Sequence, residues 1–132
     1  MLRIARFASL LPLLTLLSCA STGELIRRGE VAYDAGNMEK AYDWSRRALD
    51  RDPGNTRARA TFAAAAGVLM DGRQKEVTEL AALDTLAAAR ALLELDEFRS
   101  QLEHYLVTLP PDAEFDGLEA AVRTAAARTR RR

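Results

Sequence analysis

Two residues stand out in this sequence because their side chains can do chemistry and each occurs only once: Cys19 and His104. A thiol can be acylated or act as a nucleophile, and an imidazole can transfer a proton near neutral pH. Catalysis needs further groups at defined spacings, but the sequence contains no G-x-S-x-G, H-E-x-x-H or G-x-x-x-x-G-K-[ST] motif. A lone histidine in an amphipathic segment is typical of a surface or core residue. We therefore expect no catalytic residue and no enzyme activity.

A second group with chemical potential is the acidic run that begins at Asp112. Residues 112–117 (DAEFDG) place acids at alternate positions and glycine sixth, which resembles the opening of a calcium loop. The bidentate glutamate that such a loop needs, six residues after the glycine, is replaced by Arg123. We expect no metal site here and interpret the acids as favourable charge at the N-terminus of a helix.

The residues before Cys19 predict an exported protein. Residues 1–6 carry Arg3 and Arg6, and residues 7–17 form an eleven-residue apolar run, which is too short to span a bilayer. The following Leu-Leu-Ser-Cys, residues 16–19, resembles the bacterial lipobox. This resemblance implies cleavage after Ser18 and a covalent lipid, palmitate-type acyl chains, on the sulfur and new amino group of Cys19. No other cofactor is expected.

Cleavage at another position is an open alternative. Residues 18–20 (SCA) also fit a small-x-small site with the cut before Ser21, which would release a soluble exported protein without any cysteine. With the lipobox, Ala20 follows the anchor where an aspartate would resemble an inner-membrane retention signal. This favours the outer membrane, with the protein facing the periplasm. The expected division is a signal peptide at 1–18, a lipidated cysteine and tether at 19–21, and one domain at 22–132.

The size and charge of the remaining chain limit its partners and its means of stabilisation. Removing residues 1–18 leaves 114 residues, enough for one small domain with a single core. Two of the 19 basic residues leave with that segment and none of the 19 acidic ones, so the side chains keep a net charge near −2. Such a weak field does not attract nucleic acid. Since no thiol remains besides Cys19, no disulfide can form within the domain, and helix packing must stabilise it.

The pattern of apolar residues and caps predicts an all-α domain. Sustained apolar/polar alternation is absent, whereas helical periods with plausible starts and stops recur. Ser21 and Glu24 form a capping box, Gly36 is a natural left-handed stop, and Asn37 and Asn55 can cap the next two helices. The expected helices cover approximately residues 22–35, 37–52, 56–71, 74–95, 97–108 and 112–130. The fifth would present Phe98, Leu102, Tyr105, Leu106 and Leu109 on one stripe, and the last Phe115, Leu118, Val122 and Ala125.

Residues 22–55 resemble one tetratricopeptide repeat of the usual 34-residue length. The matching positions are Gly29, Gly36, Ala41, Ala48, Leu49 and Pro53. In physical terms, small residues allow close approach of two helices, Gly36 permits a positive φ, and Pro53 ends the second helix. Where the family often has large residues the chain has Leu25, Arg28, Ala32 and Ser45, and Tyr33 and Trp44 can fill part of that space.

The repeat fades along the chain. Residues 56–70 read as the first helix of a second repeat, with Phe62 and Ala63 at its leucine-glycine position, and the register is lost after Gly72. The resemblance implies antiparallel helical hairpins stacked as a short right-handed solenoid of five or six helices, closed by the last helix.

The resemblance also implies a function, because the first helix of each tetratricopeptide repeat lines a concave surface that holds a peptide or a partner helix. The partner-binding positions that it implies are Ile26, Glu30, Tyr33, Asp34, Arg57, Ala60 and Ala64. We expect an adaptor or accessory subunit of a cell-envelope assembly that binds another envelope protein. The alternative is a helical protein that self-associates as a homo-oligomer.

Two further features bear on membrane contact. Only two or three residues separate Cys19 from the first expected helix, so a tether of about 10 Å holds the domain close to the bilayer. Residues 120–132 contain five arginines and no acid. These arginines can contact anionic lipid or an acidic partner, or simply complement the dipole of the last helix.

Overall fold

The computed structural model describes residues 20–129. The predicted signal peptide, Cys19 and Arg130–Arg132 lie outside the described residues, so their roles stay predictions. The described chain is all-helical, with no strand, as the sequence predicts. Its five helices are α1 (Thr22–Asp34), α2 (Met38–Arg51), α3 (Thr56–Leu83), α4 (Thr85–His104) and α5 (Ala113–Thr129).

The predicted caps at the N-terminal end of the domain are confirmed. The side-chain oxygens of Ser21, Asn37 and Asn55 accept hydrogen bonds from backbone amides three residues on, at 3.2, 3.2 and 3.0 Å. Gly36 has φ +74°, the left-handed conformation that ends α1. The reciprocal half of the capping box is wrong, because Glu24 accepts instead from Arg27 and Arg28. These hydrogen bonds lower the pKa of the exposed Glu24 carboxyl to about 2.

The prediction that a helix ends near Gly72 is wrong, and so are the bounds 74–95 and 97–108. Helix α3 continues through Gly72 to Leu83, since the burial of Met70 and Val77 on either side outweighs the ~1 kcal/mol that an interior glycine costs. The chain breaks instead at Asp84, whose carboxylate accepts from the amides of Leu86 and Ala87 at 2.8 and 3.2 Å and caps α4. Two helices, α3 and α4, therefore replace three expected ones, and the described residues form five helices rather than six.

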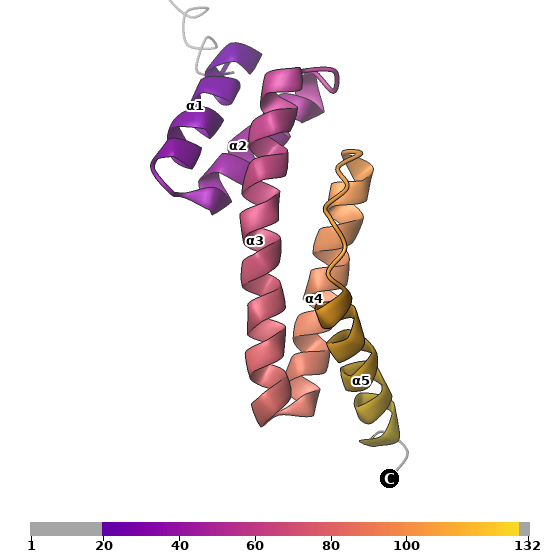
Figure 1. Ribbon diagram of the computed structural model, residues 1–132. Helices are drawn as coiled ribbons and strands as arrows, with labels where there is room; N and C mark the ends of the chain where they lie inside the picture. The colour runs from indigo at the N-terminus through magenta and orange to yellow at the C-terminus, as the bar shows by residue number, and fades with distance from the viewer. Residues whose placement is uncertain (1–19, 130–132) are drawn as a thin grey trace, which may run out of the picture.

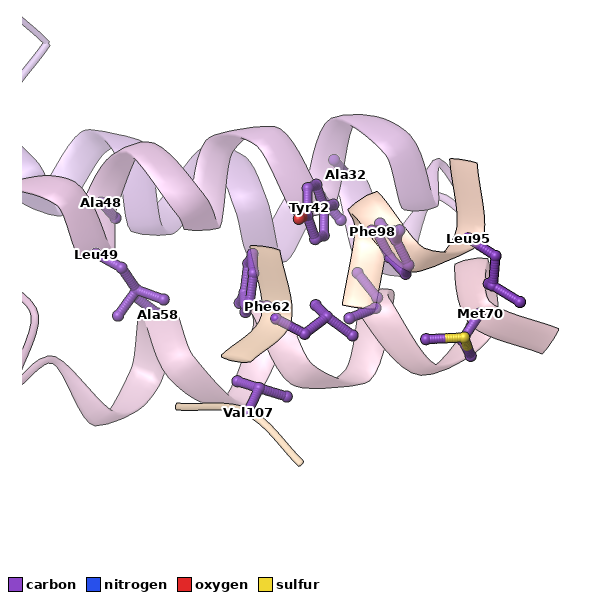
Figure 2. Close-up of a cluster of buried hydrophobic side chains, with 14 of the residues drawn as sticks. Ala32, Tyr42, Ala48, Leu49, Ala58, Phe62, Met70, Leu95, Phe98 and Val107 are labelled. Carbon is purple, nitrogen blue, oxygen red and sulfur yellow. The ribbon is translucent and has the colours of Figure 1, made fainter. Parts of the chain in front are cut away.

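The helices pack in chain order around the long helix α3. Figure 1 shows α1 and α2 at one end of α3, α4 beside α3, and α5 against α4. Figure 2 shows the core, in which Tyr42 of α2 meets Phe62 of α3 and Phe98 of α4. The ring centroid of Tyr42 lies 4.6 Å from that of Phe62 and 5.4 Å from that of Phe98. One aromatic cluster thus joins three helices.

The end of α4 differs from the predicted apolar stripe. Leu106 was expected in the core but is 82% exposed, because α4 ends at His104 and Leu106 takes φ +56°. Its amide donates to the carbonyl of Glu103 at 2.9 Å, and the amide of Val107 to that of Leu102 at 3.0 Å. This is the Schellman arrangement that Gly36 makes after α1, built with a leucine at the position that favours glycine.

Replacing Leu106 therefore tests how much strain this turn holds. We expect Leu106→Gly to keep the free energy of unfolding or raise it by up to about 1 kcal/mol, because a left-handed leucine costs about 1–2 kcal/mol and this one is exposed. The matched control is Gly36→Leu, which should lower the free energy of unfolding by a similar amount. Urea denaturation measures both, and a clear loss of stability in Leu106→Gly would contradict the strain.

Helix α5 is held by a small apolar contact and a group of ion pairs. Phe115 and Val122 are its only buried residues. Glu119 contacts Arg99 of α4 at 2.8 Å and Arg123 at 2.7 Å. Burial raises the pKa of Glu119, but the hydrogen bonds from these arginines outweigh it, so the net shift is downward.

The docking of α5 is therefore expected to weaken in acid. A carboxyl whose pKa is lower in the folded state adds stability above its ordinary value of 4.5, and this contribution is lost as the pH falls through the folded value. Hydrogen exchange, corrected for its intrinsic pH dependence, should speed up in α5 before it does in α3. The variant Glu119→Gln should show the faster exchange already at neutral pH. Equal protection of α5 from exchange at neutral and at acidic pH would contradict this role of Glu119.

Candidate partner-binding surface

The predicted partner-binding residues lie on α1 and the first half of α3, two helices that contact each other. Their clearest contact is between Glu30 and Arg57, whose guanidinium donates two hydrogen bonds to the two carboxylate oxygens at 3.0 and 2.8 Å. The Arg57 side chain is 70% exposed and the Glu30 side chain 33%. An exposed ion pair of this kind contributes about 0–1 kcal/mol, so a ligand can displace either partner at little cost.

Small residues form the neighbouring part of α3. Ala60 and Ala64 are exposed, and a further step of four residues reaches Val68, which is 49% exposed. Residues four apart share a helix face, so these three small side chains form a strip of apolar surface that projects little from the helix. Val68 was missing from the predicted set, although its four-residue spacing from Ala64 was visible in the sequence.

Two of the predicted residues pack in or against the core, one of them buried and the other only in part. Ile26 is buried at 7% exposure, so it belongs to the core and offers a partner little area in this conformation. Tyr33 is half-buried and packs against the core, leaving only part of its ring available. Asp34 is exposed at the end of α1. The surface that remains is Glu30, Asp34, Arg57, Ala60 and Ala64, extended by Val68 and the exposed part of Tyr33.

Among residues 20–129, the histidine, the acidic residues and a hollow beside α3 and α4 give little basis for a catalytic or metal site. His104 is exposed at the end of α4, with its ring edge against Tyr105. No group of three or more His, Cys, Asp or Glu within residues 20–129 lies close enough to hold a metal ion. A hollow of about 360 Å³ lies between α3, α4 and residues 107–112, lined by Met70, Leu102 and Val107, but it contains neither histidine nor cysteine.

Comparison with known proteins gives no family for this chain. No protein-family model, curated protein or solved structure matches it. Across the described part of the chain, no helix combines the length and apolar character that crossing a membrane requires.

Proposed function

We propose that this protein is a small membrane-anchored lipoprotein that acts as a protein–protein adaptor or accessory subunit in a bacterial cell envelope. The observation that carries the adaptor role is the exposed strip of Ala60, Ala64 and Val68 beside the Glu30–Arg57 pair. Small side chains let the backbone of a partner segment approach α3 closely. An exposed arginine next to them supplies an anchor for a partner carboxylate.

The proposed architecture behind this surface is a short tetratricopeptide-like solenoid. In it, α1 with α2 forms the first helical hairpin and the start of α3 opens the second. The close contact of Gly29 with α2 and the left-handed Gly36 support the first hairpin. The length of α3 sets a limit, since 28 residues exceed the first helix of an ordinary repeat. We infer one regular repeat followed by a longer, irregular helix pair.

The anchor is proposed from the lipobox, and the start of the fold sets the length of its tether. Ser21 already caps α1, so only Ala20 lies between Cys19 and the folded domain. A tether of this length, about 4 Å per residue, keeps the domain against the bilayer and restricts partners to membrane-embedded or similarly anchored proteins.

The first experiment is the intact mass of the protein purified from membranes of cells that express the full chain. A diacylated or triacylated chain beginning at Cys19 is expected, and Cys19→Ser should move the protein out of the membrane fraction. An unmodified chain beginning at Ser21 would overturn the anchor and favour the soluble, self-associating alternative. Light scattering of that chain would then separate a monomer from an oligomer.

The partner surface is tested by blocking the small-residue strip. Ala64→Arg places a large side chain on an exposed position of α3 and should abolish photo-crosslinking of a partner from a probe at the exposed Asp34, which leaves Arg57 in place. Ala82→Arg is the matched control, because it makes the same change at an exposed position near the other end of α3. Equal crosslinking in the two variants would show that partners do not bind this strip.

A further inference from the structure

A stripe of three basic residues and the only tryptophan of the chain runs along α2. Lys40, Trp44, Arg47 and Arg51 follow one another at steps of four, three and four residues, so they share one helix face. Lys40, Arg47 and Arg51 are exposed, and Trp44 is half-buried against the core. We call these four residues the basic stripe of α2. It is about 16 Å long at the rise of an α-helix.

The tryptophan lies between two guanidinium groups. The central carbons of Arg28 and Arg47 each lie 4.9 Å from the Trp44 ring centroid. Two acids also touch this surface, Asp43 against Arg47 at 3.0 Å and Glu24 against Arg28 at 2.7 Å. With four cations and two acids, the surface keeps a net positive charge. Arginines beside a tryptophan match the level of phospholipid headgroups, where tryptophan is enriched and guanidinium binds phosphate.

The stripe ends where the chain leaves toward its proposed anchor. Nη1 of Arg51 donates a hydrogen bond to the backbone oxygen of Ala20, the residue that follows Cys19. A lipid on Cys19 would therefore leave the domain next to Arg51. The bilayer is then the surface nearest to the stripe, and the charge of the lipid headgroups decides whether the bilayer attracts the stripe.

We propose that the basic stripe of α2 lies against anionic phospholipid headgroups of the bilayer that holds the anchor. This inference rests on the proposed lipid at Cys19. It assigns membrane contact to Lys40, Trp44, Arg47 and Arg51 of the domain. Attraction of each cation to such a surface weakens as salt screens it.

Trp44 provides the test, since no other tryptophan contributes to the fluorescence. The protein purified from membranes, with its lipid verified by mass, is reconstituted in phosphatidylcholine vesicles with or without phosphatidylglycerol. Brominated phosphatidylcholine should quench Trp44, and its emission should shift to the blue, only when phosphatidylglycerol is present. The double variant R47Q/R51Q should lose both effects. The control K75Q/R90Q, which removes two exposed cations from α3 and α4, should keep them.

The possible outcomes separate this proposal from the anchor. A lipidated protein whose Trp44 is not quenched in anionic vesicles overturns the stripe and leaves the anchor intact. Equal loss in both double variants also overturns it, because net charge alone would then explain the effect. Protection of Trp44 from acrylamide in native membranes without quenching by lipid would assign the stripe to a protein partner instead. If the mass shows no lipid, the soluble chain is added to the same vesicles, where quenching supports the stripe and its absence overturns it.

Discussion

Phe62→Ala should lower the free energy of unfolding by about 3–5 kcal/mol, the usual cost of removing a buried aromatic side chain. Phe62 is completely buried, and its ring centroid lies 4.6 Å from that of Tyr42 and 5.0 Å from that of Tyr105. Removing the ring opens a cavity where α2, α3 and the end of α4 meet. Because small domains are stable by only about 5–15 kcal/mol, this loss removes a large part of the stability and should raise the unfolded fraction at 37 °C.

Urea denaturation followed by far-UV circular dichroism measures this loss. Leu83→Ala is the control, since Leu83 also lies on α3 but is 85% exposed, and we expect a change within about 0.5 kcal/mol. A loss below about 1 kcal/mol in Phe62→Ala would mean that the aromatic cluster does not hold the three helices together.

Gly29→Leu should destabilise the protein by about 3 kcal/mol through overpacking between α1 and α2. A Cβ atom at Gly29 would lie 2.7 Å from Oγ of Ser45, a distance that real contacts essentially never show. Ser45 is itself buried and donates to the carbonyl of Ala41 at 2.7 Å, so it cannot move without losing that bond. Gly72→Leu is the matched control. It should raise the free energy of unfolding by about 0.5–1 kcal/mol, because leucine favours a helix over glycine and nothing lies within 4 Å of the Cβ position.

A double-mutant cycle shows whether the clash is local. Ser45→Ala removes the Oγ atom, after which the nearest neighbour of a Cβ at position 29 is the Ser45 backbone nitrogen at 3.4 Å, close to ordinary contact. Gly29→Ala should therefore cost less in the Ser45→Ala background, with a coupling energy of about 1 kcal/mol. Independent effects of the two substitutions would contradict this account of the α1–α2 interface.

The adaptor and stripe proposals use different faces of the domain and fail separately. The partner surface depends on α3 and the C-terminal half of α1, whereas the stripe depends on α2 and the position of Ala20. A domain held by both its lipid and the stripe has a restricted orientation at the membrane. Partners would then meet the α1–α3 surface in a limited range of directions, which raises their effective concentration at that surface.

The sequence alone determined the helical class of this protein and the start of its first three helices. These features are local, since Ser21, Asn37 and Asn55 cap amides only three residues away and Gly36 needs only its own φ. The composition pattern that suggests an exported lipoprotein is also read directly from residues 1–19, which the structure does not describe.

Only the tertiary structure decided how the helices continue and which side chains are exposed. Whether Gly72 ends a helix depends on the burial of Met70 and Val77 against distant residues, and a local pattern cannot weigh that energy. The exposure of Leu106 depends on a break at His104, and the burial of Ile26 depends on how α1 packs. The spacing of the basic stripe is visible in the sequence. Its position beside the proposed anchor follows only from one long-range contact, the hydrogen bond from Arg51 to Ala20.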